Sequence, residues 1–176
     1  MLQQHIRNFT DKVIEALNVG SMEMINLNQD MLTPDFILLG LLAQEDSMIV
    51  EILETAYPHD LEISQKIMER IYSLQRDQPK FKGTAVGHIQ VPKETEVLFK
   101  TAQEQAKLLG DKFIGLEALF LALFEKSLGK IPILLEEMGV TYEKVKSEIE
   151  SLRGGRTINE KGTEGKSDIP EQFTTD

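Results

Sequence analysis

The sequence predicts an all-α fold made of two four-helix repeats, eight helices in all, and three observations favour it. Aliphatic residues and seven Met supply most of the apolar side chains, whereas aromatic residues make up 6% and Trp is absent. That composition suits helices better than a sheet sandwich. Apolar residues recur at helical spacing along most of the chain. The sequence also matches itself without a gap at an offset of 82 residues, which is typical of an internal repeat.

The internal match covers four segments and sets the domain organisation. It pairs apolar or acidic residues, among them Leu17 with Phe99, Leu32 with Ile114, Asp35 with Glu117, Ile52 with Leu134 and Ile67 with Ile149. We therefore expect repeat 1 at residues 1–74, an inter-repeat linker at 75–91 and repeat 2 at 92–152. Two such units are expected to pack against each other about a pseudo-two-fold axis.

The first two helices of repeat 1 follow from spacing and caps. Apolar residues at helical spacing predict a helix from about Phe9 to Ile25. Thr33 and Pro34 then supply an N-cap and a proline at the first helical position of a helix that runs to about Glu45.

Two shorter helices complete repeat 1. Ser47 is expected to cap a helix over residues 48–55, which ends because the residue before Pro58 is pushed out of the α region. Asp60 is expected to cap an amphipathic helix whose apolar face carries Leu61, Ile63, Ile67 and Ile71.

Repeat 2 has the same order of elements. It begins at Pro92, and its last helix covers residues 141–152, after a helix stop at Gly139. The linker at 75–91 contains Pro and Gly and has no helical period. Residues 37–42 and 119–124 are more apolar than one helix face can bury, so the second helix of each repeat is expected to be central.

From Arg153 to Asp176 the helical pattern stops. This stretch is polar, contains Gly and is poor in aliphatic residues, which predicts a flexible linker. Residues 165–167, Gly-Lys-Ser, resemble the end of a phosphate-binding loop. Glu160 stands where that motif needs Gly, and Pro170 follows where it needs a helix, so we interpret the match as chance.

Composition excludes several classes of function. The net charge is −10, which disfavours nucleic-acid binding. Cysteine is absent, which excludes disulfides, thiolate metal sites and a cysteine nucleophile. No apolar run reaches the ~20 residues of a membrane span. The first residues lack the features of a signal peptide, so a cytoplasmic location is expected.

No catalytic or metal-binding constellation stands out. His5, His59 and His88 lie in different segments without a ligand partner at helical spacing, so neither a metal nor a catalytic residue is expected. Asp35 and Glu117 occupy equivalent positions in the first turn of each second helix. From the residues alone, stabilisation by the helix dipole, worth ~0.3–1 kcal/mol, is favoured over an acidic site for a cationic partner.

Three segments carry a family resemblance: residues 9–13, 32–42 and 109–117. In these segments the chain resembles the double Clp repeat domain at the N-terminus of Clp-type AAA+ unfoldases. The last of them, Leu-Gly-Asp-Lys-Phe-Ile-Gly-Leu-Glu, is the most specific. Residues 152–176 look like the stretch that leads into the first ATPase module of ClpB-type proteins.

The resemblance implies a substrate-docking domain rather than an enzyme. It implies binding of unfolded or aggregated polypeptide, with adaptor or co-chaperone proteins as further partners, and no nucleic acid or membrane. It also implies a homohexameric parent that holds ATP and Mg²⁺, whereas this chain holds no cofactor and is expected to be monomeric alone. The family positions for substrate binding match Thr10, Asp111 and Glu117. Thr101 and Gln105 stand where ClpB relatives tend to carry apolar groove residues.

Two alternatives remain at this stage. In the ClpC-type class, the acids matching Asp35 and Glu117 bind the guanidinium of a phosphorylated arginine or an adaptor protein, and a carboxylate suits a guanidinium. Phe36 and Ala118 replace the histidine that some relatives carry after these acids. The third reading is a structural spacer without a ligand. A uniformly acidic surface would favour the spacer, and an exposed apolar patch would favour substrate capture.

Overall fold

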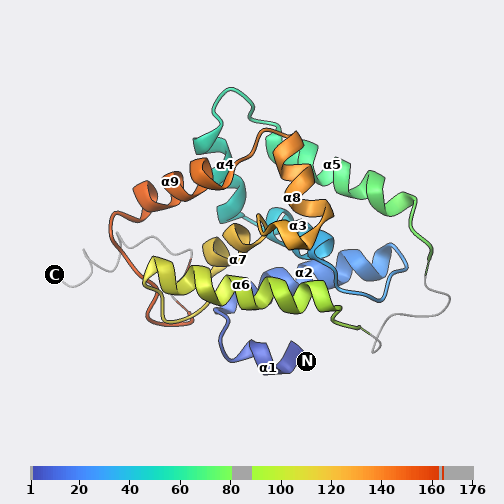
Figure 1. The fold of residues 1–176 in the computed structure, drawn as a ribbon, viewed down its shortest axis with the longest axis horizontal. Coiled ribbons are helices and arrows are strands. Elements are labelled where there is room, and N and C mark those ends of the chain that lie inside the picture. Colours follow the sequence, from blue (N-terminus) through green and yellow to red (C-terminus); the bar gives the residue numbers. More distant parts are fainter. Residues whose placement is uncertain (1, 81–88, 163, 165–176) are drawn as a thin grey trace.

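The computed structural model describes residues 2–80, 89–162 and 164, and over these residues the chain is helical (Figure 1). The helices of repeat 1 are α2 (Asp11–Asn26), α3 (Pro34–Ala43), α4 (Met48–Ala56) and α5 (Ile63–Arg76). Those of repeat 2 are α6 (Lys93–Leu109), α7 (Leu116–Ala122), α8 (Lys130–Glu137) and α9 (Tyr142–Arg153), with a 3₁₀ turn, η1 (Lys126–Leu128). The all-α, two-repeat prediction is confirmed. One further helix, α1 (Leu2–Ile6), was not predicted.

The two repeats exchange contacts in a reciprocal way. Helices α2, α3 and α4 begin 82 residues before α6, α7 and α8. Helix α4 packs on α9 while α5 packs on α8, and α2 contacts α7 while α3 contacts α6. Such exchange is the pattern that a pseudo-two-fold axis produces. Helices α3 and α7 contact each other at the centre of the molecule and are buried along nearly their whole length, as predicted (Figure 1). None of the described helices is long and apolar enough to span a bilayer.

Two cross-repeat hydrogen bonds tie the repeats together. The Ile114 N–H donates to the Asn8 carbonyl at 2.7 Å, and the Leu32 N–H donates to the Gln90 carbonyl at 2.8 Å. The residues of the first bond are equivalent to those of the second at the 82-residue offset. In each bond, the segment before the first helix of one repeat meets the segment before the central helix of the other. This places Thr10, the N-cap of α2, on the seam between the repeats.

The helix caps of repeat 1 agree only in part with the prediction. The Ser47 hydroxyl accepts a hydrogen bond from the Val50 N–H at 3.2 Å, so this cap is confirmed. Thr33 is the N-cap residue of α3, but its hydroxyl makes no capping bond and is buried. Proline at position 34 has no N–H, which leaves fewer donors for a cap in this turn.

The predicted start of the fourth helix is wrong. Helix α5 begins at Ile63 rather than after Asp60, and Leu61 is 64% exposed instead of buried. The Asp60 carboxylate pairs with Lys66 at 3.2 Å. Because the Asp60 carboxylate pairs with Lys66, it does not cap the helix. The turn from Asp60 to Glu62 precedes the first helical residue, Ile63.

The start of the predicted flexible linker also differs from expectation. Arg153 ends α9 with a buried side chain, and Gly154 and Gly155, at φ of 58° and 89°, turn the chain back toward the body. Ile158 and Glu164 are then buried. We call residues 156–162 together with Glu164 the strap. The predicted flexibility of residues 165–176 lies outside the described residues.

Helices α2 and α3 cross at two glycines. A Cβ added to Gly40 would overlap the Ala16 carbonyl oxygen, and a Cβ added to Gly20 would overlap the Phe36 carbonyl oxygen. The backbones of the two helices therefore meet with no side chain between them. In repeat 2 the equivalent positions are Ala102 and Ala122.

We therefore expect Gly40→Ala to destabilise the protein, although alanine is the better helix former by about 1 kcal/mol. Overpacking of a tight contact typically costs about 1–3 kcal/mol. Urea denaturation measures the change in the free energy of unfolding. Asn18→Ala, at an exposed position of α2, is the control and should change this free energy by less than about 0.5 kcal/mol. A Gly40→Ala protein as stable as the wild type would contradict the packing described here.

Candidate functional site

A buried arginine joins two of the three predicted substrate-binding residues. The Arg153 guanidinium donates to both carboxylate oxygens of Asp111, from Nη1 at 2.7 Å and from Nη2 at 2.8 Å. Its Nε donates to Glu117 Oε1 at 2.7 Å. The Asp111 side chain is fully buried, and those of Arg153 and Glu117 are each 9% exposed. A two-pronged guanidinium–carboxylate pair fixes both distance and plane.

The turn between α6 and α7 explains why Asp111 lies under the end of α9. Gly110 ends α6 in the left-handed region at φ 81°, and the Asp111 N–H donates back to the Ala106 carbonyl at 2.8 Å. This is a Schellman-type stop that redirects the chain by one tight turn. Glu117 then follows in the first turn of α7.

The third predicted residue, Thr10, is occupied by the strap. The Thr10 hydroxyl accepts from the Val13 N–H at 3.2 Å, as a helix N-cap does, and donates to Glu164 Oε1. The other Glu164 oxygen accepts from the Leu116 N–H at the start of α7. One carboxylate thus bridges the starts of α2 and α7, and both Thr10 and Glu164 are buried.

Burial governs the protonation of this cluster. Burial raises the pKa of Glu117 above its ordinary value, although the charge and hydrogen bonds of Arg153 act in the opposite direction. Burial likewise raises the pKa of Glu164 to about 7, against the lowering effect of its bonds to Thr10 and Leu116. Burial disfavours the charged form of Arg153, but Asp111 and Glu117 outweigh it and raise the pKa of the guanidinium.

Asp35, the repeat 1 equivalent of Glu117, has a neutral partner. Its Oδ2 accepts from Gln75 Nε2 at 3.1 Å, and burial raises the pKa of the Asp35 carboxyl. Asp35 and Glu117 are therefore both buried, but each has its own partner from the last helix of its own repeat. The structure brings Thr10, Asp111 and Glu117 together around Arg153 and Glu164, whereas Asp35 belongs to a separate pair.

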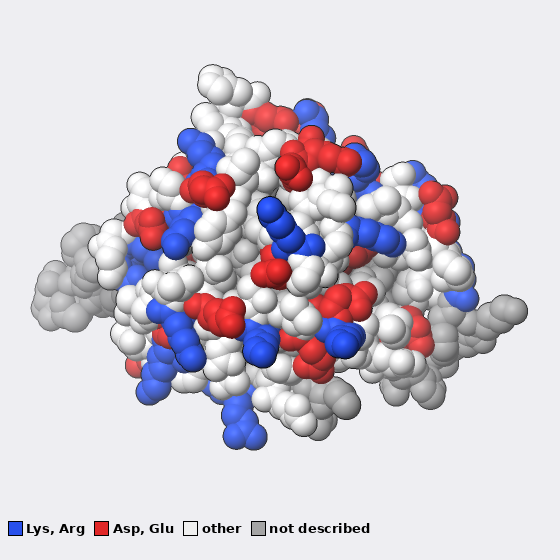
Figure 2. Space-filling model, viewed as in Figure 1, with Lys and Arg blue, Asp and Glu red and all other residues white. Residues whose placement is uncertain are grey.

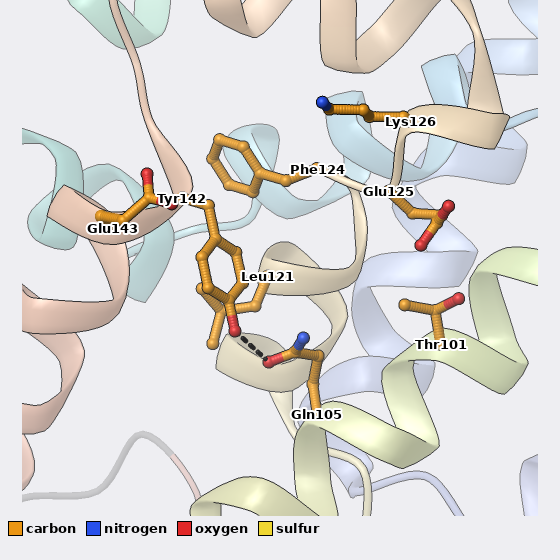
Figure 3. Close-up of a pocket in the computed structure, with 8 residues that line it drawn as sticks. All are labelled: Thr101, Gln105, Leu121, Phe124, Glu125, Lys126, Tyr142 and Glu143. Atoms are coloured by element: carbon orange, nitrogen blue, oxygen red, sulfur yellow. Dashed lines mark hydrogen bonds between the residues drawn. The ribbon is translucent and has the colours of Figure 1, made fainter.

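Thr101 and Gln105 line a shallow pocket of about 340 Å³ between α6, α7, the turn before η1 and α9 (Figure 3). Leu121, Phe124 and Tyr142 supply its apolar wall. The Tyr142 hydroxyl bonds to Gln105 Oε1 at 3.0 Å across the pocket (Figure 3). The charged side chains of Glu125, Lys126 and Glu143 complete the lining, so the pocket combines aromatic and polar groups.

The remaining sequence candidates have ordinary structural surroundings. His5 bonds to Glu96 at 2.8 Å and lies against Phe99, and His59 is exposed. His88 and the Gly-Lys-Ser stretch at 165–167 lie outside the described residues. Among the residues that the structure describes, no group of His, Asp or Glu has the arrangement of a metal site.

The surface charge is mixed rather than uniformly acidic on the face shown in Figure 2, where Lys and Arg alternate with Asp and Glu between uncharged areas. The large exposed apolar residues, among them Met22, Leu61, Leu108 and Ile133, come from four different helices or their flanks. This face thus does not have the acidic shell that would favour a simple spacer.

Fold and site together define a two-repeat helical domain with a buried charge cluster on its inter-repeat seam. The family comparison is specific: the Clp repeat (R) N-terminal domain model matches residues 8–132, more than half of the chain. The chain belongs to this family.

Similar proteins agree with this membership. The chain is 28% identical over 168 residues to the chaperone protein ClpB of Vibrio cholerae and 26% identical over 169 residues to that of Corynebacterium diphtheriae, in each case over 96% of this chain. It spans about a fifth of the length of these curated relatives, 19% in both.

Solved structures share the fold at lower identity. The Hsp104 N-terminal domain from Candida albicans has a TM-score of 0.64 at 17% identity, over 88% of this chain and 97% of that one. The N-terminal domain of the ClpV1 ATPase from E. coli has a TM-score of 0.67 at 19% identity, over 91% and 93%.

Sequence analysis missed the two residues that hold the site together, Arg153 and Glu164. The loss of the helical pattern predicts a linker from Arg153 onward, although Arg153 continues the spacing of the buried Val145 and Ile149 along α9. The repeat offset also places it opposite Ile71, which is fully buried. Glu164 has no comparable signal, because its partners come from distant parts of the chain.

We expect Arg153→Ala to lower the free energy of unfolding by about 3–5 kcal/mol, because it leaves two buried carboxylates without their cation. Arg70→Ala is the matched control. Arg70 pairs with Glu137 at 2.6 Å, but both side chains are about half exposed, so its loss should cost at most ~1 kcal/mol. Chemical denaturation measures both, and equal effects would contradict a structural role for the buried pair.

The raised pKa of Glu164 predicts a pH dependence. A carboxyl whose folded pKa exceeds its unfolded value contributes stability that is complete at low pH and is lost as the pH rises through about 7. Glu117 raises and Arg153 lowers this pKa as the charged neighbours of Glu164. The free energy of unfolding should therefore fall as the pH rises from 5 to 8. In Glu164→Gln this fall should be smaller than in the wild type by on the order of 1–3 kcal/mol. Glu160→Gln, at an exposed position, should follow the wild-type profile.

Proposed function

We propose that this chain is the substrate-docking N-terminal domain of a longer, ClpB-like AAA+ disaggregase or unfoldase. In this proposal it binds unfolded or aggregated polypeptide and presents it to the hexameric ATPase ring of the parent protein. ATP and Mg²⁺ act in the parent and not in this chain. Thr10, Asp111 and Glu117 form the binding site on the seam between the repeats.

One observation supports this proposal: the seam binds a stretch of polypeptide through its main chain. The Lys112 N–H donates to the Ile158 carbonyl at 2.8 Å, and the Asp11 N–H donates to the Lys161 carbonyl at 3.0 Å. Asp111 Oδ1 accepts from the Ile158 N–H at 2.9 Å. Main-chain recognition gives affinity without demanding one sequence, which suits a domain whose clients differ in sequence.

The size of this surface favours weak binding. A contact of a few main-chain hydrogen bonds and one or two side chains is far smaller than a standard protein interface. We expect affinities of roughly micromolar or weaker for a single domain. Six copies around one ring would raise the effective concentration of sites and make such weak binding useful.

The ClpC-like alternative ranks second for a geometric reason. A phosphoarginine guanidinium at Glu117 would compete with Arg153, which already donates to that carboxylate at 2.7 Å. At Asp35 it would compete with Gln75 in a buried position. An adaptor protein that contacts the same seam remains an outcome of the binding test.

Titration calorimetry with a permanently unfolded, apolar-rich polypeptide tests the proposal. The wild type should bind saturably, and Glu117→Gln should weaken binding at least about fivefold, since hydrogen bonds to charged groups contribute about 1.5–3 kcal/mol. This variant retains an acceptor for Arg153 and leaves Asp111 to balance the guanidinium. Glu54→Gln, an exposed residue of α4, makes the same charge change and should bind like the wild type.

A further variant separates the seam from the pocket of Figure 3. Gln105→Ala removes the Tyr142 partner without touching Thr10, Asp111 or Glu117, so it should leave the affinity unchanged. Weaker binding by Gln105→Ala alone would move the site to the pocket. A wild-type protein that binds no unfolded polypeptide would contradict the proposed function.

A further inference from the structure

The strap contacts two of the three residues of the proposed site, Thr10 and Asp111. Glu164 accepts the hydroxyl hydrogen of Thr10, and the Ile158 N–H bonds to Asp111, whereas Glu117 is paired with Arg153 at the end of α9. Thr10 is fully buried, and Asp111 and Glu117, counted as whole residues with their main chain, are 9% and 7% exposed. A client polypeptide therefore has no access to Thr10 and Asp111 while the strap lies on the seam.

Specific side-chain and main-chain contacts hold the strap on the seam. A Cβ added to Gly115 would meet the Ile158 Cδ1 at 2.5 Å and would overlap a Glu164 carboxylate oxygen. Both strap side chains thus depend on the missing side chain at Gly115. The strap combines an apolar anchor, a carboxylate six residues later and main-chain hydrogen bonds between them.

The contacts that hold the strap are few, and desolvation and like charge act against one of them. Ile158 is 8% exposed and lies at the edge of the molecule, outside the main cluster of buried apolar residues. The Glu164 carboxylate must give up water to enter the seam and faces Glu117 there. A segment held by a small number of contacts opens more readily than the helical core beneath it.

We propose that the strap is an intramolecular occupant of the substrate site, which a client must displace. This inference rests on the proposed function, because it concerns the regulation of the same seam. The strap and the client compete for the same N–H and carboxylate groups. The apparent affinity for a client is then the intrinsic affinity reduced by the fraction of molecules whose strap is open.

The first test weakens the apolar anchor with Ile158→Ser and uses Ile133→Ser as the control. Ile133 lies on α8 and is 56% exposed, so it makes the same chemical change away from the seam. Hydrogen exchange at the amides of Asp11 and Lys112 should accelerate in Ile158→Ser. The Leu32 amide bonds to the Gln90 carbonyl across the repeats and makes no contact with the strap, so it should stay protected.

The same variants are then titrated with the unfolded polypeptide. Ile158→Ser should bind about tenfold more tightly than the wild type if the strap is closed in about nine molecules of ten, and Ile133→Ser should bind like the wild type. Accelerated exchange with unchanged affinity would overturn the strap proposal and leave the proposed function intact. Weaker binding would make the strap a part of the client site and would also overturn it. Loss of binding in every variant, the wild type included, would overturn both proposals.

A reversible crosslink provides a test that does not depend on the Ile158 variant. The chain has no cysteine, and a Cβ placed on Gly162 lies 3.3 Å from the Asp11 carboxylate, so the two positions face each other. In the doubly substituted Asp11→Cys, Gly162→Cys protein, oxidation should abolish client binding and reduction should restore it. The Asp11→Cys protein alone should not respond. Equal binding by the oxidised and reduced forms would overturn the inference.

Discussion

The guanidinium of Arg153 is the interaction on which the rest of the site depends. Without it, Asp111 and Glu117 would be two buried like charges on adjacent turns. With it, Asp111 is held in one orientation by a pair of hydrogen bonds, and that orientation presents Oδ1 to the Ile158 N–H. The end of α9, the α6–α7 turn and the beginning of the strap therefore meet in a single charge cluster, and each constrains the others.

The charge balance of this cluster separates a fixed part from a movable part. Asp111 and Glu117 are bonded to Arg153, the charge of Arg156 also lowers the pKa of Glu117, and Glu164 lies close enough to Glu117 and Arg153 to be affected by their charges. The pair of Arg153 with Asp111 is geometrically complete. Burial raises the pKa values of Glu117 and Glu164. Glu117 is fixed by its helix, whereas Glu164 lies on a segment without secondary structure.

The sequence predicted the parts of the fold that depend on periodicity and missed those that depend on distant partners. The 82-residue offset locates the starts of six helices, because each repeat is one local pattern of apolar residues. The same offset places Arg153 at the position of Ile71, which is buried in repeat 1. A charged residue at a buried position needs a buried partner, so the sequence contained a signal for the Arg153 pair. Helix α1 is too short for a periodic signal, and its His5 is held by Phe99 and Glu96 of another helix. Glu164 follows no pattern, since Thr10 and Leu116 lie far away in the sequence.

The duplication also explains why the described residues form such a site on the first seam and no equivalent one on the second. An exact repeat would place an equivalent carboxylate-binding position on the second seam, near Leu32 and Gln90. There, however, Pro92 stands at the position of Thr10 and Pro34 at that of Leu116. Neither proline has an N–H or a hydroxyl to donate, so both hydrogen bonds that hold Glu164 on the first seam are missing on the second. The Leu32 carbonyl, whose equivalent at Ile114 accepts from the Thr10 N–H, instead accepts from the Thr95 hydroxyl at 2.6 Å. The Leu32 carbonyl on the second seam is thus bonded within the repeats, whereas the first seam is covered by a segment that lies outside both repeats.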